Sequence, residues 1–247
     1  MSLLSFYEKI ASKAEHNEIL FHLGKATQLS LLKLKGFVSF GRSGVIRDYL
    51  NTHPVRKLQL GSGLKLLDGW LNSDCSLVFK SKCFLDVTAR FPLEDKSFDY
   101  VYTEHLIEHL TYLEGLSLLR ESFRVLKPGG SIRVACPDLR IIVGLYAPEK
   151  TEAQKQYIKS SVDASLPHIR IYKESFVINN DVRNWGHKFL YDEETLAAAL
   201  ESAGFTEVKR FKPAESNDPN LQNLESHGPG NEGKYFITLV LQAKRPA

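Results

Sequence analysis

The chain has 247 residues, of which 43% are hydrophobic and 25% are charged, and its formal net charge is +3. These values exclude a disordered polypeptide, and the small net charge gives no reason to expect nucleic acid as a partner. No apolar stretch approaches the roughly 20 residues of a membrane span, and the first residues lack the pattern of a signal peptide. We therefore expect a cytoplasmic protein with no membrane span.

The first part of the sequence has the spacing of helices. Apolar residues recur at intervals of three and four within 3–20 and 25–35, which predicts two helices. Residues 36–44 are expected to form a flexible break between glycines, and 47–50 a short element before the first strand. We assign 1–55 to a helical N-terminal extension that caps the substrate.

From residue 57 onward, predicted strands alternate with predicted helices. The strands are expected near 57–60, 71–73, 83–85, 98–102, 131–136, 206–211 and 235–243. The helices are expected near 112–126, 138–146, 151–161 and 193–203. This alternation predicts an α/β, Rossmann-like, mostly parallel sheet with helices on both faces and an antiparallel edge strand.

The alternation is interrupted at about 147–190, where prolines, paired asparagines and several aromatic and basic residues follow one another. An insertion of this length between regular elements is typical of a lid or binding loop. We assign 56–247 to a single domain that contains this insertion, and we assign the insertion to substrate capture.

The first strand ends in a turn that contains Gly61 and Gly63. Glycines at this place let the backbone approach a ligand closely, because no Cβ intervenes. Leu66 stands where a dinucleotide fingerprint has its third glycine, and no P-loop sequence follows. Neither NAD nor a P-loop nucleotide is favoured as the ligand.

The phrase Gly69-Trp-Leu-Asn-Ser-Asp74 and the segments 86–110 and 120–134 carry a stronger signal. Over roughly 57–138, the sequence resembles class I S-adenosylmethionine-dependent methyltransferases, most closely the branch that acts on small molecules. The resemblance implies S-adenosylmethionine as the cofactor and S-adenosylhomocysteine as the product. It also implies the cofactor-binding residues, which are Gly61, Ser62, Gly63, Asp74, Asp86, Val87 and Glu104.

The resemblance also implies a role for each of these residues. The glycine turn holds the methionine part of the cofactor, and Asp74 accepts hydrogen bonds from the ribose hydroxyls. Asp86 and Val87 bracket the adenine, and Glu104 lies near the amino acid moiety. Carboxylates and backbone N–H groups are the partners that the hydroxyls and the carboxylate of this cofactor require.

Three histidines, His105, His109 and His187, are the candidate catalytic residues. His105, Glu108 and His109 are spaced to lie on one side of a helix. One interpretation is a general base, His105 or His187; a second is structural histidines, with His109 buried. A third, not favoured, is a divalent metal bound by this group with His187 as fourth ligand. Metal-dependent relatives use Glu-x-x-Glu-His, whereas this chain has His105 at the first position.

The predicted activity is methyl transfer to a small polar acceptor, and we expect a hydroxyl group of a saccharide or secondary metabolite. Three alternatives remain open: N-methylation of a small amine, a nucleoside-binding module without catalysis, and an oxidoreductase on a similar sheet. The sequence has no Asn/Asp-Pro-Pro-Tyr phrase and no appended basic module, so a nucleic acid substrate is not expected. The oligomeric state is not predicted.

Overall fold

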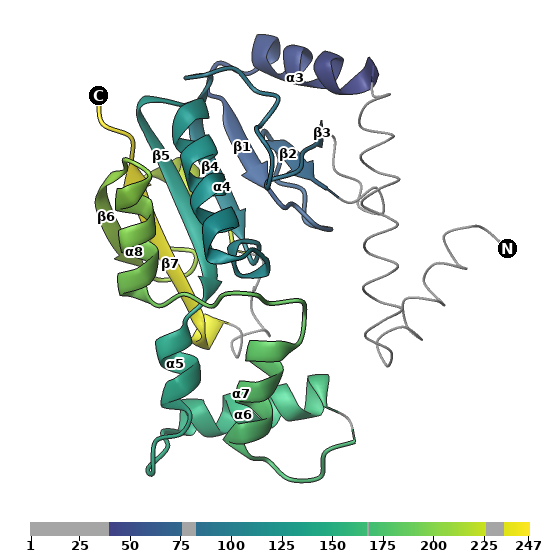
Figure 1. The fold of residues 1–247 in the computed structure, drawn as a ribbon, viewed down its shortest axis with the longest axis vertical. Helices are drawn as coiled ribbons and strands as arrows, with labels where there is room; N and C mark the ends of the chain where they lie inside the picture. Colours follow the sequence, from purple (N-terminus) through teal and green to yellow (C-terminus); the bar gives the residue numbers. More distant parts are fainter. Residues whose placement is uncertain (1–39, 76–82, 167, 226–234) are drawn as a thin grey trace, which may run out of the picture.

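The computed structural model describes residues 40–75, 83–166, 168–225 and 235–247. Seven strands within these ranges form one sheet in the order β3-β2-β1-β4-β5-β7-β6 (Figure 1). They are β1 (Lys57–Leu60), β2 (Leu71–Asp74), β3 (Cys83–Phe84), β4 (Phe98–Glu104), β5 (Leu126–Pro137), β6 (Thr206–Phe211) and β7 (Thr238–Lys244). The helices predicted at 3–20 and 25–35 lie outside the described residues.

Strands β1 to β5 run parallel, whereas β7 is antiparallel to both of its neighbours, β5 and the edge strand β6. The predicted mostly parallel, Rossmann-like sheet with antiparallel pairing at one edge is therefore confirmed. The strand order reverses between β1 and β4, and a reversal of this kind opens a crevice beyond the carboxyl ends of the strands.

The described helices are α3 (Phe40–Thr52), α4 (Tyr112–Val125), α5 (Leu139–Gly144), α6 (Glu152–Ser165), α7 (Glu174–Arg183) and α8 (Glu193–Ser202). Capping boxes start α4 at Thr111, α6 at Thr151 and α8 at Asp192, which explains why the sequence located these helices well. The predicted break at 36–44 is wrong in its described part, because α3 begins at Phe40. None of the described helices is long and apolar enough to cross a membrane.

The two faces of the sheet differ in polarity. Side chains such as Leu58, Val101 and Ile132 point to one face and form the main core with α3, α4 and α8. The residues that alternate with them include Gln59 and Arg133, which are buried on the opposite face. Within the described ranges, segment 212–225 contributes Leu221 and Leu224 to a small cluster on this second face.

The described part of the predicted N-terminal extension packs directly on the sheet. Tyr49 on α3 belongs to the main core, and its hydroxyl accepts a hydrogen bond from the backbone of Lys57 at 2.8 Å. Because residues 1–39 lie outside the described ranges, the extension and its boundary at 55/56 stay predictions.

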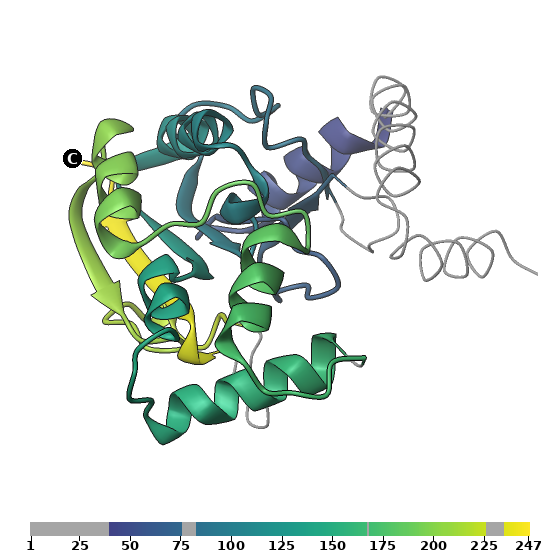
Figure 2. The same ribbon diagram turned by 60° about the horizontal axis from the view of Figure 1, so that its bottom comes forward.

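The insertion at 147–190 contains two helices, α6 and α7, which lie with α5 beyond the carboxyl end of β5 (Figures 1 and 2). These helices share a separate core that includes Ile142, Tyr157, Val162 and Val177. The sequence predicted α6 but not α7, since the β-branched and asparagine residues of α7 have low helix propensity.

Candidate functional site

The carboxyl ends of β1, β2 and β4 meet at the point where the strand order reverses. Gly61 and Gly63 follow β1 with φ values of 65° and 51°. A Cβ on Gly61 would lie 3.0 Å from the side chain of Leu106, so this position is restricted both by conformation and by space. Gly61 is therefore fixed by the local fold at the carboxyl end of β1.

Asp74, the last residue of β2, fixes the shape of this turn. Its Oδ2 atom accepts a hydrogen bond from the backbone N–H of Gly63 at 2.9 Å. Between the two glycines, Ser62 is 4% exposed, and its hydroxyl has no hydrogen-bond partner within the described residues. A buried polar group without a partner is costly, so this hydroxyl is suited to a polar ligand.

Asp86 and Val87 follow β3 on the neighbouring strand. One oxygen of Asp86, Oδ1, accepts hydrogen bonds from the backbone and the hydroxyl of Thr88, at 2.9 and 2.6 Å. Val87 is 8% exposed. Leu85 donates a backbone hydrogen bond to the carbonyl of Asp74, which keeps the two acids on adjacent strand ends.

Sequence reasoning missed Lys65, a partly buried residue just after the glycine turn. Its ammonium group donates a hydrogen bond to the carbonyl of Leu224 at 2.6 Å. Burial lowers the pKa of Lys65, and the negative charges of Glu104 and Glu225 oppose this shift. Lys65 therefore brings a positive charge near Glu104 at the end of β4, and only the folded chain brings these two residues near each other.

His105 and Glu108 form a hydrogen-bonded pair immediately after β4. The predicted helix is only a 3-10 turn, η1 (Ile107–His109), and His105 precedes it with a φ of 47°. The His105 Nδ1 atom lies 3.0 Å from Glu108 Oε1. Burial disfavours the charged form of Glu108, but the hydrogen bond and charge of His105, with the charge of His109, hold the pKa of Glu108 below its ordinary value.

His187 reaches the same place from the loop after α7. The backbone N–H groups of Lys188 and Phe189 both donate to the carbonyl of Glu108, at 2.8 and 3.2 Å. The rings of His109 and His187 meet edge to face with their centroids 5.0 Å apart. These contacts attach the loop after α7 to η1.

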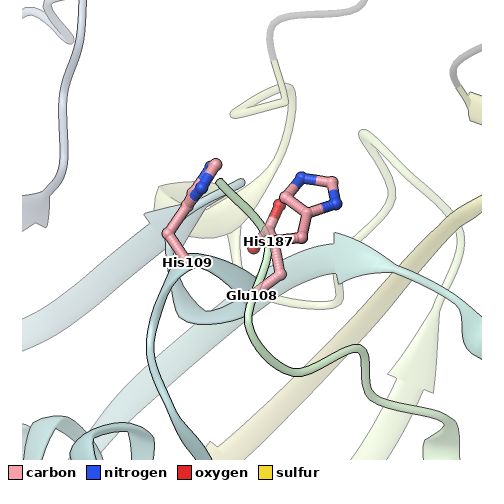
Figure 3. A group of neighbouring side chains, drawn as sticks. All are labelled: Glu108, His109 and His187. Atoms are coloured by element: carbon pink, nitrogen blue, oxygen red, sulfur yellow. The ribbon is translucent and has the colours of Figure 1, made fainter. Parts of the chain in front are cut away.

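The structure brings together most of the predicted histidine group. Donor atoms of Glu108, His109 and His187 all lie within 4.8 Å of one another, and the three side chains point to the same side of η1 (Figure 3). His105 is not part of this trio, but it contacts Glu108 through Nδ1. The other Glu108 oxygen, Oε2, is buried and has no hydrogen-bond partner among the described residues.

The chain matches a known family over part of its length. Residues 77–134 match a family model described as a methyltransferase domain. The match contains Asp86, Val87, Glu104 and the His105–His109 segment, whereas the glycine turn precedes it. No curated protein matches the sequence.

Several solved structures are similar in fold at low sequence identity. A Mesorhizobium loti S-adenosylmethionine-dependent methyltransferase has 18% identity and a TM-score of 0.47, with 82% of this chain and 96% of that chain covered. Haemonchus contortus phosphoethanolamine N-methyltransferase 2 in complex with S-adenosyl-L-methionine has 14% identity and a TM-score of 0.44, with 84% of this chain and 53% of that chain covered. The CurJ carbon methyltransferase has 16% identity and a TM-score of 0.44, with 78% of this chain and 49% of that chain covered. The chain thus spans about half the length of the last two proteins.

Proposed function

We propose that the chain is a class I S-adenosylmethionine-dependent methyltransferase, which the methyltransferase-domain match and the strand order support, and that it methylates a hydroxyl group of a small polar acceptor, such as a saccharide or secondary metabolite. The observation that carries this proposal is the His105–Glu108 pair beside the glycine turn. A hydroxyl acceptor must lose its proton during transfer, and a histidine oriented by a buried carboxylate can accept that proton.

The residues at the strand ends fit the cofactor. The glycine turn leaves room for backbone contact, and the buried Ser62 hydroxyl offers a polar contact. We assign the methionine part to Gly61, Ser62 and Gly63, and the amino group to Glu104. We assign the ribose to Asp74, and the adenine to Asp86 and Val87. The bound cofactor supplies an electrophilic methyl group on a cationic sulfur.

In this proposal, His105 is the general base. Its Nδ1 atom faces Glu108, so the ring orientation is fixed and Nε2 is the atom that would accept the acceptor proton. His109 and His187 lie beside Glu108, where the loop after α7 contacts η1. Holding the acceptor in line with the methyl group can lower the activation free energy of the transfer by about 7–11 kcal/mol.

Asp74→Ala is expected to weaken binding of S-adenosylhomocysteine by about tenfold or more, because a hydrogen bond to a charged group is lost. The variant also loses the contact with Gly63 that shapes the turn. Asp68→Asn, which changes an exposed acid in the same loop, serves as the control. Calorimetry with S-adenosylhomocysteine checks this prediction, and equal affinities of Asp74→Ala and the control would count against the ribose assignment.

The direct test of the function is product formation with a panel of acceptors. Purified protein is incubated with S-adenosylmethionine and hydroxylated saccharides, phenols or small amines, and release of S-adenosylhomocysteine is measured. We expect turnover with hydroxylated compounds and a methyl ether as the product. Turnover with amines only would replace the proposal by N-methylation, and cofactor binding without any turnover would favour a binding module.

A further inference from the structure

We propose that Glu108, His109 and His187 bind one divalent transition-metal ion, for which zinc suits the donor set best. Two imidazoles and one carboxylate are a common ligand set for zinc sites that retain an open coordination position. The binding of the metal stands on the geometry alone. Its suggested role, holding the acceptor oxygen at the open position, rests on the proposed function.

The donor atoms of Glu108, His109 and His187 are close enough to share one ion. The three donor atoms already lie within 4.8 Å of one another. In a tetrahedral site with bonds of about 2.0–2.2 Å, donor atoms are separated by about 3.3–3.6 Å. The remaining difference is of the size that small side-chain rotations cover, and His109 and His187 are both only partly buried.

Glu108 is a buried carboxylate with one oxygen left for a cation. Its side chain is 0% exposed, and its Oε2 atom has no hydrogen-bond partner within the described residues. A buried carboxylate oxygen without a partner is costly, and a cation beside it removes that cost. His105 holds the other oxygen, as an outer-shell partner of a metal-bound carboxylate does.

His187 is oriented by a hydrogen bond to the backbone. Its Nδ1 atom lies within hydrogen-bond distance of the backbone carbonyl of Asp181, so Nδ1 carries the proton and Nε2 carries the lone pair. A metal-binding histidine is commonly held in this way. The ligands come from η1 and from the loop after α7, so the metal would also join the insertion to the sheet.

Metal uptake is the test. The protein is prepared with Cys75→Ser, which removes the exposed thiol, and then incubated with zinc or manganese and dialysed. Metal content by mass spectrometry and calorimetry with each metal alone give stoichiometry and affinity. We expect about one zinc per chain, at least about tenfold weaker binding in Glu108→Gln and in His187→Ala, and unchanged binding in the exposed control Glu94→Gln.

The outcomes separate the two proposals. No zinc or manganese uptake, or equal uptake by His187→Ala and the control, would overturn the metal site. His187→Ala keeps the test valid if Glu108→Gln fails to fold, as judged by circular dichroism. Methyl transfer without metal uptake would overturn the metal site and leave the proposed function standing. Metal uptake without any methyl transfer would overturn the proposed function and leave the metal site standing.

Discussion

Replacing Glu225 by glutamine is expected to reduce the free energy of unfolding by about 3–5 kcal/mol. Glu225 forms a bidentate ion pair with Arg133 of β5, with N–O distances of 2.7 and 2.9 Å, and both side chains are 0% exposed. Glu225 also accepts a hydrogen bond from the backbone of Ala214 at 2.6 Å. Removing its charge leaves the Arg133 guanidinium buried without a counter-charge, which is the costly half of breaking such a pair.

Urea unfolding of the wild type and the variant measures this loss. Glu215→Gln is the matched control, because Glu215 lies in the same segment with its side chain 63% exposed, and we expect it to change stability by less than about 0.5 kcal/mol. A change of similar size in the two variants would show that the ion pair does not fasten segment 212–225 to the sheet. The pair matters to the site because Leu224, next to Glu225, receives the hydrogen bond from Lys65.

His105→Gln is expected to lower kcat for methyl transfer by about 10²–10⁴-fold, the usual contribution of a positioned general base. Glutamine keeps a hydrogen-bonding side chain but cannot accept the acceptor proton. Because His105 is not among the residues assigned to the cofactor, the affinity for S-adenosylhomocysteine is expected to change by less than about threefold, or roughly 0.7 kcal/mol.

Steady-state kinetics and calorimetry on the same preparations check this split between turnover and binding. His53→Gln at the end of α3 is the control, since its ring contacts Tyr49 and lies away from the strand ends. Retained turnover in His105→Gln would remove His105 from the catalytic role. Loss of cofactor affinity along with turnover would instead indicate a role in shaping the crevice.

The sheet and the glycine turn could be predicted because their signals are local. Buried strands, capped helices and glycines at a strand end each depend on residues close together in the sequence. The predicted alternation therefore agrees with β1 to β5 and with α4, α5, α6 and α8. The predicted positions of Asp74 and Glu104 at strand ends are confirmed, since these residues end β2 and β4, and their roles toward the cofactor stay predictions.

The remaining features depend on contacts between distant residues. His187 reaches Glu108 through backbone hydrogen bonds from Lys188 and Phe189, after a turn in which Trp185 and Gly186 both have positive φ. No local pattern encodes that approach. The Arg133–Glu225 pair is similar, since its partners are 92 residues apart and each alone looks like an ordinary surface charge.

In the proposed function, the S-adenosyl cofactor binds at the ends of β1, β2 and β4 through the turn at Gly61. Calorimetry of the wild type and Gly61→Val with S-adenosylhomocysteine, and of the wild type with NAD, measures this binding. We predict binding of one S-adenosylhomocysteine per wild-type chain, no binding of NAD, and loss of binding in Gly61→Val, where the new side chain would meet Leu106 at a φ of 65°. Undiminished binding in Gly61→Val, or a wild type that binds NAD but not S-adenosylhomocysteine, would contradict the claim.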